Sequence, residues 1–229
     1  MWKMWFCIVI LLLIAGVFAE VERELHTFCI TRYKVLSPKW NGEKSGKIIF
    51  LSDLHNHEYG LHNKKLIDKI KKENPELILI GGDILVGKED ISYESAAGFV
   101  EAICKIAPVY YANGNHEQRM KEKPEKYGNA FVGYKKRLLD AGVHFLENES
   151  AEVELGGNKL CLTGLELQLE VYEKMKTHKV TKEDVAQKVG PAKQEEIQIL
   201  LAHNPEYMEA YQAWGSDITL SGHLHGGLI

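Results

Sequence analysis

Five short polar patches, each following an apolar run, constrain the fold of this chain more than any other feature of its sequence. They are Asp53-Leu54-His55, Gly81-Gly82-Asp83, Gly114-Asn115-His116-Glu117, Ala202-His203-Asn204 and Gly222-His223-Leu224-His225. Each run has the content of a short buried strand, and segments with apolar residues at helical spacing separate several of the runs. Strands that alternate with helices form parallel βαβ units, and ligands bind at the carboxyl ends of such strands. The sequence therefore predicts an α/β fold in which the five patches meet at one site.

The periodicity also places the individual elements. Strands are expected over 48–51, 77–80, 108–112, 143–146, 151–155, 159–163, 197–202 and 217–220, and helices over 63–73, 95–106, 130–141 and 205–213. The Gly156-Gly157-Asn158 sequence predicts a hairpin turn between two of these strands. A further strand is expected over 26–36, where apolar and polar residues alternate, and a polar loop over 39–46 follows it. Residues 168–193 form a polar excursion with weak helical periodicity.

The content and order of the five patches resemble the calcineurin-like metallophosphoesterase superfamily, and the resemblance runs from about residue 47 to the end. The pattern looks closer to bacterial membrane-associated members than to the protein phosphatases. The resemblance implies a four-layer α-β-β-α sandwich, a site with two divalent metal ions, and hydrolysis of a phosphoester by a hydroxide that bridges them. Two metals about 3.5–4 Å apart can activate a water and neutralise the charge on a phosphoryl group.

The resemblance also implies a role for each residue of the patches. Asp53, His55 and His225 would hold the first metal, Asn115, His203 and His223 would hold the second, and Asp83 would bridge both. His116 would face the substrate and donate a proton to the leaving oxygen, which suits an imidazole with a reference pKa of ~6.5. A mixed set of imidazole, carboxylate and amide ligands suits manganese, iron or zinc better than calcium or magnesium.

Other interpretations of single residues stay open. Asp53 or Asp83 can cap a helix after a strand, and His203 can be a hydrogen-bonded loop histidine. The joint occurrence of all five patches favours the metal site. Glu117 either supports its loop or caps a helix, and His57 either lines the substrate entrance or is a surface histidine.

The second patch departs from the protein phosphatases of the superfamily, which carry an aspartate and an arginine where this chain has Val86 and Gly87. The missing arginine argues against a phosphoserine or phosphothreonine phosphatase. The missing aspartate would have supported His116, so Glu89 and Asp90 are the candidates for that support. The resemblance favours a phosphodiester or pyrophosphate substrate, with a lipid-linked molecule as one option. The alternatives are a phosphomonoesterase of the same fold and a non-catalytic metal-binding module.

The N-terminus is apolar enough to be a membrane anchor or a signal peptide. Residues 5–18 are apolar or small, with Lys3 before them and three glutamates between residues 20 and 24 after them. The run is short for the ~20 residues that span a bilayer, and small residues up to Ala19 suit signal cleavage. Trp2 and Trp5 suit a membrane interface and favour the anchor. Under both interpretations Lys3 stays inside, so the catalytic domain faces away from the cytoplasm.

These observations divide the chain into three parts. Residues 1–19 are expected to be the anchor or signal segment, 20–46 a lead-in strand and loop, and 47–229 the metallophosphoesterase domain. Superfamily members usually continue past the last patch for several strands, so the resemblance implies a domain truncated at its C-terminus. The formal net charge of −4 gives no reason to expect a nucleic-acid-binding protein. The four cysteines form no C-x-x-C pair, which argues against a zinc knuckle or a redox motif.

Overall fold

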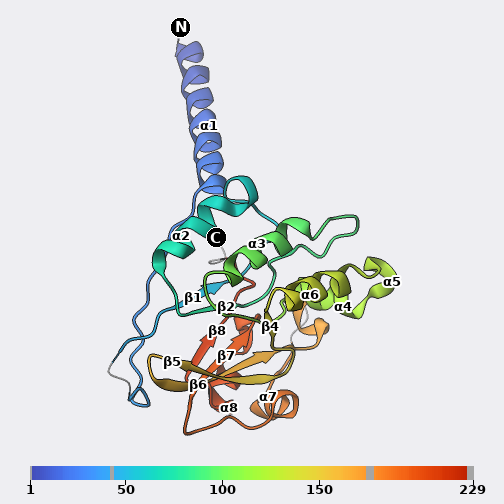
Figure 1. Ribbon diagram of the computed structural model, residues 1–229. Helices are drawn as coiled ribbons and strands as arrows, with labels where there is room; N and C mark the ends of the chain where they lie inside the picture. The colour runs from blue at the N-terminus through green and yellow to red at the C-terminus, as the bar shows by residue number, and fades with distance from the viewer. Residues whose placement is uncertain (1, 42–43, 174–177, 226–229) are drawn as a thin grey trace.

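Two four-stranded sheets form the centre of the molecule (Figure 1). The computed structural model describes residues 2–41, 44–173 and 178–225, which include all five polar patches. The first sheet has the order β1-β2-β3-β4 and is parallel throughout. Its strands are β1 (Ile48–Leu51), β2 (Leu77–Ile80), β3 (Val109–Tyr111) and β4 (His144–Phe145).

The second sheet has the order β5-β6-β7-β8 and begins with an antiparallel hairpin. Its strands are β5 (Ser150–Leu155), β6 (Asn158–Leu165), β7 (Ile197–Ala202) and β8 (Ile218–Leu220), and the last three are parallel to one another. Gly156 and Gly157 turn the hairpin with φ of 55° and 79°, a backbone conformation that glycine adopts without steric cost. The eight strands predicted between residues 48 and 220 and the hairpin are therefore confirmed.

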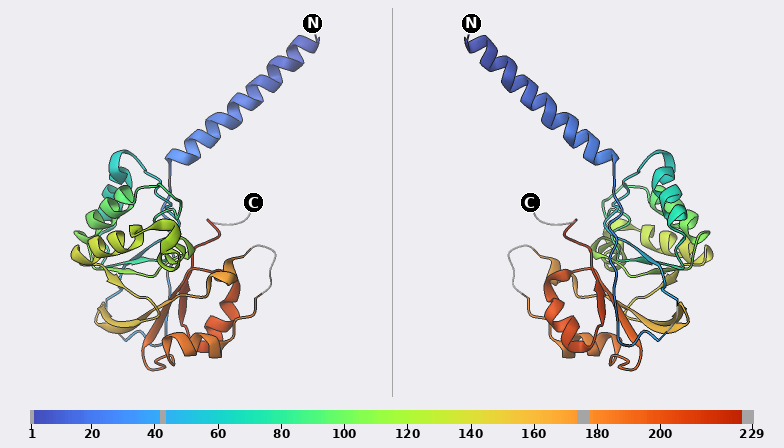
Figure 2. Two further views of the ribbon diagram at one scale, coloured as in Figure 1. Left: turned by 90° about the vertical axis from the view of Figure 1, so that its right-hand side faces the viewer. Right: turned by 90° about the vertical axis from the view of Figure 1, so that its left-hand side faces the viewer.

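Helices cover the outer face of each sheet, so the layers run α-β-β-α (Figure 2). On the first sheet they are α2 (Lys64–Glu73), α3 (Glu94–Cys104), α4 (Asn115–Glu122), α5 (Pro124–Tyr127) and α6 (Ala130–Asp140), and on the second α7 (Lys182–Val189) and α8 (Met208–Trp214). Short 3₁₀ segments are η1 (Leu61–Asn63), η2 (Leu169–Tyr172) and η3 (Pro205–Tyr207). The expected α/β sandwich is confirmed.

Strand β2 shows how the layers are held together. All four of its residues are buried, and successive side chains of a strand point to opposite faces. Ile78 and Ile80 pack with the helices of the first sheet. Leu77 and Leu79 pack against the second sheet through Leu162 and neighbouring residues. A continuous apolar run is thus needed because both faces of this strand are covered.

The N-terminal segment projects from the body as a single long helix, α1 (Trp2–His26), none of whose residues is buried (Figures 1 and 2). By length and composition it can cross a membrane. The strand predicted over 26–36 is wrong, because α1 extends to His26 and no strand follows before Ile48 in the described residues. The alternating residues do not form a common buried face there. Phe28 packs on Tyr59, but Tyr33 is 86% exposed.

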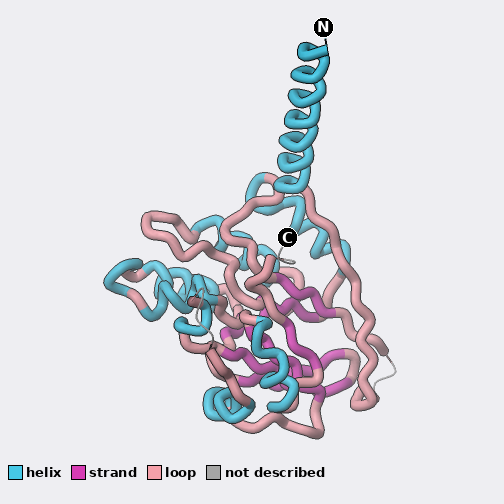
Figure 3. The backbone as a smooth tube through the Cα atoms, turned by 180° about the vertical axis from the view of Figure 1, so that it is seen from behind, coloured by secondary structure: helices cyan, strands magenta, loops and turns pink. Residues whose placement is uncertain are grey.

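The segment after α1 runs as a loop along the side of the molecule toward the far end of the second sheet, as Figure 3 shows. The Lys39 Nζ lies 2.7 Å from a carboxylate oxygen of Asp217, and the Asn41 backbone N–H donates to Asn158. Nearer α1, Arg32 pairs with Glu73 at 2.5 Å. This segment is therefore attached to helix α2 and to the second sheet before the chain enters β1.

Candidate metal centre

The five polar patches converge at the carboxyl ends of the strands. Asp53 follows β1, Asp83 follows β2, Asn115 begins α4 just after β3, His203 follows β7, and His223 and His225 follow β8. Five of the predicted ligands have a left-handed backbone: Asp53 (φ 56°), His55 (47°), Asp83 (53°), His223 (71°) and His225 (50°). Non-glycine residues pay about 1–2 kcal/mol each for that conformation. Such strain concentrates at functional sites, where the surrounding fold enforces it.

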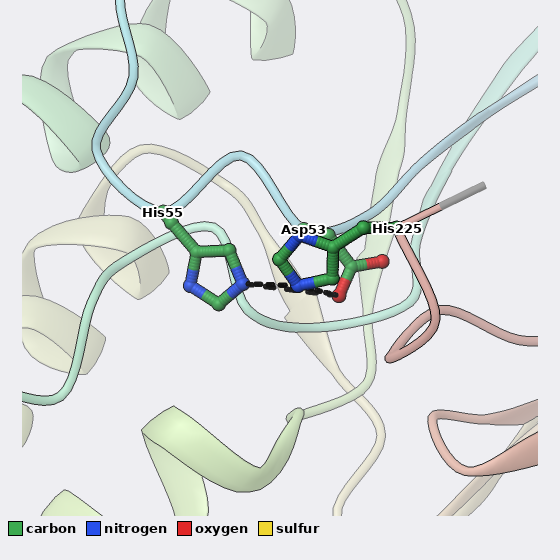
Figure 4. Close-up of side chains that lie close together, drawn as sticks. All are labelled: Asp53, His55 and His225. Carbon is green, nitrogen blue, oxygen red and sulfur yellow. Dashed lines mark hydrogen bonds and ion pairs between the residues drawn. The ribbon is translucent and has the colours of Figure 1, made fainter. Parts of the chain in front are cut away.

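Asp53, His55 and His225 form one cluster, which Figure 4 shows. The Asp53 Oδ1 lies 3.9 Å from the Nε2 of His55 and 3.7 Å from the Nε2 of His225. The two imidazole Nε2 atoms are 3.1 Å apart, and their rings stack. These three residues are the ones that the resemblance assigns to the first metal.

Asp83 lies at the centre of the site and is only 2% exposed. Its Oδ2 is 3.2 Å from the Nε2 of His203, 3.8 Å from that of His55 and 3.9 Å from that of His116. Its Oδ1 accepts the backbone N–H of His116 at 2.8 Å. The carboxylate of Asp83 thus lies between candidate ligands of both expected metals. This is the position that a residue shared by the two metals would need.

The imidazole of His203 supplies a direct test of whether these residues fit a metal ion. Its Nδ1 lies 2.7 Å from the carbonyl oxygen of Gly81, which can only accept, so Nδ1 carries the proton. Nε2 is buried 3.2 and 3.8 Å from carboxylate oxygens of Asp83 and Asp53, and it has no hydrogen-bond partner among the described residues. In the neutral ring its lone pair would face the lone pairs of these oxygens, which requires a cation between them, either a proton or a metal ion. The donor set therefore fits a metal.

The pKa values show the same demand for positive charge. Burial disfavours the charge on His203, but the adjacent Asp83 outweighs this and raises the pKa of His203 to about 9. Burial of Asp83 acts in the opposite direction from the pairing with His203, which prevails and lowers the pKa of Asp83 to about 2. In the metal-free protein a proton on His203 thus supplies the positive charge that an ion would bring.

Asn115 and His223 form the other side of the site. The Nδ1 of His223 lies 3.1 Å from the Oδ1 of Asn115, and the backbone N–H of His223 donates to Asp53 at 2.9 Å. The ring of Tyr172 meets His223 edge-on at 5.2 Å between centroids and lies 6.1 Å from that of His203. Sequence reasoning missed Tyr172, because it lies in the polar excursion with no motif around it.

Glu117 supports the two neighbouring ligand loops from within the core. Its side chain is fully buried and accepts the backbone N–H groups of Asp83 (2.8 Å), Ile84 (3.0 Å) and Gly114 (3.0 Å). The hydroxyl of Tyr111 donates to it at 2.7 Å. Of the two interpretations left open for Glu117, both are realised: it caps the start of α4 and it joins the Asp83 loop to the Asn115 loop. Its burial, with the negative charge of Asp83 nearby, raises its pKa to about 7.

His116 stands at the mouth of the site, with a side chain about one-fifth exposed. Its Nδ1 accepts the backbone N–H of Gly87 at 2.7 Å. The prediction that Glu89 or Asp90 supports this ring is wrong, because the Gly87 amide occupies Nδ1 and Glu89 pairs with Lys126 instead. Burial lowers the pKa of His116 to about 4, against the opposing effect of Asp83.

His57 lies beside the site and is half-buried. Its ring meets that of Tyr59 edge-on at 4.6 Å between centroids. Its Nε2 is buried and has no hydrogen-bond partner among the described residues. The expected surface position is therefore only partly correct, because the ring packs against the loop that follows the first patch.

Two stacked sheets between helical layers, with aspartate, histidine and asparagine side chains gathered at the strand ends, define the class of metal-dependent phosphoesterases. The family model for calcineurin-like phosphoesterases matches residues 46–227, and the chain belongs to this family. It is thus a hydrolase of phosphoesters by family, with grouped aspartates and histidines that can hold metal ions.

The chain is similar to several bacterial proteins. It is 26% identical over 212 residues to the uncharacterised protein YpbG of Bacillus subtilis, covering 89% of this chain and 68% of that protein. It is 26% identical over 189 residues to the phosphodiesterase YaeI of Escherichia coli, covering 80% and 62%. A crystal structure of phosphopantetheinyl hydrolase (PptH) from Mycobacterium tuberculosis aligns with a TM-score of 0.49 at 13% identity, over 79% of this chain and 83% of that one. The chain therefore spans about two thirds of the length of these curated relatives.

Proposed function

We propose that this chain is a membrane-anchored, metal-dependent phosphoesterase that cleaves a phosphodiester or pyrophosphate bond. The observation that carries the proposal is the buried Nε2 of His203, which lies 3.2 and 3.8 Å from carboxylate oxygens of Asp83 and Asp53, where a cation is required. Membership of the calcineurin-like family supplies the class of reaction. The similarity to a phosphodiesterase favours a diester or anhydride over a monoester.

In this proposal the ligands divide as the family resemblance implies. Asp53, His55 and His225 would hold one ion, Asn115, His203 and His223 would hold the other, and Asp83 would be shared by both. Imidazole together with carboxylate and amide oxygen suits manganese, iron or zinc. When bound, the two ions supply an activated water and neutralise charge on the phosphoryl oxygens.

The remaining residues orient this set and contact the substrate. Gly81 fixes the ring of His203 through its carbonyl oxygen, and Glu117 fixes the Asp83 loop relative to α4. His116 is partly exposed above Asp83, where its Nε2 can meet an oxygen of the substrate phosphoryl group. Interactions of this kind are fixed before substrate arrives, which is what makes electrostatic stabilisation effective.

The position of α1 supports membrane anchoring close to the site. The helix ends at His26, and Phe28 packs on Tyr59 at 4.8 Å between ring centroids. Tyr59 in turn contacts His57, two residues beyond His55. The end of α1 is thus attached to the loop that carries the first ligands. In our proposal residues 1–19 lie in the membrane, 47–229 form the catalytic domain outside the cytoplasm, and phosphoesters linked to lipids are within reach.

Hydrolysis by matched variants tests the enzymatic part. The full chain in detergent micelles with manganese should hydrolyse bis(p-nitrophenyl) phosphate, and Asp83→Asn should abolish this while circular dichroism stays unchanged. Asp68→Asn is the control, because Asp68 is exposed on α2, where it pairs with Lys64 on the same helix. Full activity of the Asp83→Asn protein would contradict the proposed bridging role.

Membrane extraction tests the anchor. A protein held by α1 should stay in the membrane fraction after alkaline carbonate washing and keep residues 1–19 by N-terminal sequencing. A mature chain that begins at Glu20 and is found in solution would show that the segment is a signal peptide instead.

A further inference from the structure

The group that contacts Nδ1 of His116 is a hydrogen-bond donor, whereas a histidine that gives up a proton from Nε2 needs an acceptor there. The backbone N–H of Gly87 points at Nδ1 with the two nitrogens 2.7 Å apart. An amide N–H can only donate, so Nδ1 must offer a lone pair, and the proton of the neutral ring must lie on Nε2. A ring that is to release a proton from Nε2 needs an acceptor at Nδ1, as the aspartate of a catalytic triad provides.

The Gly87 amide is fixed from both sides. The preceding N–H, of Val86, donates to the Asn56 side chain at 3.1 Å, and the Gly87 carbonyl accepts from the Tyr127 hydroxyl at 3.3 Å. A β-carbon at position 87 would lie 2.9 Å from the His116 carbonyl oxygen, so the backbones are in close contact. The loop around Gly87 is therefore held in place, and with it the direction of the N–H toward Nδ1 of His116.

Two candidate ligands of the metal site also lie close to the ring. The Asp83 Oδ2 is 3.9 Å from Nε2, and the ring of His55 meets that of His116 edge-on at 4.7 Å between centroids. Glu89, the nearest acid in sequence to Gly87, pairs with Lys126 at 3.1 Å. Among the hydrogen bonds of the described residues, the only one made by Nδ1 is with Gly87.

We infer that His116 acts as a hydrogen-bond donor through Nε2–H to an oxygen of the substrate, and that it does not deliver a proton to the leaving group. Release of that proton would leave an imidazolate anion unless Nδ1 gained a proton. A proton on Nδ1 would point at the N–H of Gly87, and the two donors would repel each other.

This arrangement selects the bond that is cleaved. As the attacking oxygen bonds to phosphorus, the bond from phosphorus to the leaving oxygen breaks and its electron pair stays on that oxygen. The leaving group departs as an anion and takes a proton from water afterwards. A phosphate leaving group bears this charge easily, since its second pKa is ~6, whereas an alcohol is about as weak an acid as water, at ~15.7. Resting on the proposed function, the inference is that the substrate bond is a phosphoric anhydride (pyrophosphate) and not an alkyl phosphodiester.

Nitrogen NMR tests the proton position without relying on activity. The full chain in detergent micelles, labelled with ¹⁵N-histidine and loaded with zinc, should give His116 an unprotonated Nδ1 and a protonated Nε2. The His116→Gln protein identifies the signals by their loss. A protonated Nδ1 on His116 would overturn the inference.

The dependence of rate on the leaving group tests the consequence. With substituted-phenyl methyl phosphodiesters, log kcat/KM of the wild-type protein should fall steeply as the leaving-group pKa rises. His116→Gln keeps an N–H donor and should give a parallel line about tenfold lower, the rate equivalent of a weakened hydrogen bond. The exposed His144, changed to Gln, is the control and should leave the line unchanged. Dimethyl pyrophosphate should be hydrolysed and dimethyl phosphate should not.

The outcomes separate the inference from the proposed function. A shallow wild-type line that becomes steep in His116→Gln would show proton delivery by His116 and overturn the inference while leaving the phosphoesterase intact. If no member of the series were hydrolysed, the proposed function would fail, and the nitrogen signals would still decide the position of the proton.

Discussion

Replacing Glu117 by glutamine removes one oxygen acceptor from the core with almost no change in shape. One carboxylate oxygen accepts the N–H groups of Asp83 and Gly114. The other accepts the N–H of Ile84, the hydroxyl of Tyr111 and, at the longer distance of 3.4 Å, the N–H of Leu85. An amide nitrogen on the first side would face two backbone donors. On the second side it would face one close backbone donor, the Ile84 N–H, and a more distant one, the Leu85 N–H at 3.4 Å, because the Tyr111 hydroxyl can turn and accept. The amide should therefore take the second orientation.

The expected magnitude follows from this count. The Ile84 N–H loses its acceptor, which costs about 1–3 kcal/mol for a buried donor, and the weaker contact of the Leu85 N–H is lost with it. The remaining bonds change from charged to neutral acceptors, and hydrogen bonds to charged groups are worth about 1.5–3 kcal/mol against about 1 for neutral ones. We therefore expect Glu117→Gln to lower the free energy of unfolding by about 2–4 kcal/mol. Since the Asp83 loop also loses its fixed distance from α4, metal affinity should fall by about 10–100-fold.

Two measurements check this prediction. Urea unfolding of the chelator-treated protein, followed by circular dichroism, gives the stability, and calorimetric titration with zinc gives the affinity. Glu125→Gln, an exposed residue of α5, is the matched control and should change stability by less than about 0.5 kcal/mol. Wild-type stability together with wild-type zinc affinity in Glu117→Gln would refute the argument that this carboxylate holds the two ligand loops.

Three further predictions concern the candidate site and the segment between α1 and β1. In chelator, the pairing of His203 with Asp83 stabilises the protein below the ordinary histidine pKa of 6.5, and thermal unfolding should show this stability lost as pH rises toward about 9. Excess zinc should cancel that loss by replacing the proton, so an unchanged pH profile in chelator would contradict the assignment. Gly82→Ala should strongly lower the free energy of unfolding measured in urea, because φ is 93° and a β-carbon would lie 2.1 Å from the Gly114 nitrogen. Gly128→Ala is the control: φ is 56° and the space is open, so the loss should be only about 1–2 kcal/mol. Phe28→Ala should leave bis(p-nitrophenyl) phosphate hydrolysis nearly unchanged but increase proteolytic cleavage between α1 and β1, since the ring contact with Tyr59 is lost.

The strands and the gathering of the patches could be predicted because their signals are local. A run such as Leu77–Ile80 is apolar at every position, since both faces of β2 are covered, and Asp83 follows it directly. Helix α4 was missed because its buried side is largely polar: Asn115, Glu117 and Gln118 are buried with Met120. Hydrophobic periodicity cannot report a helix whose inward face serves the site.

The partner of His116 could not be predicted for a different reason. The contact is made by a backbone N–H, 29 residues away along the chain, and a backbone donor leaves no side-chain signature. The sequence showed only that the expected aspartate was missing at Val86 and that glycine stood at 87. We therefore expected another acidic residue near His116, but the loop instead directs the backbone N–H of Gly87 toward the ring.

The strained ligands link metal binding to the ordering of the segment that carries His223 and His225. Five left-handed ligand residues cost about 1–2 kcal/mol each. Most of them lie on loops that the core fixes, as Glu117 fixes Asp83. Residues 221–225 have less support, because their hydrogen bonds to the rest of the fold run to the site itself: His223 to Asp53, Gly222 to the carbonyl of His203, and His225 to His55. A metal site that exists only in the folded chain adds its binding free energy to the free energy of folding. In the proposed site, ion binding would therefore offset the strain of these residues and order their segment in the same step.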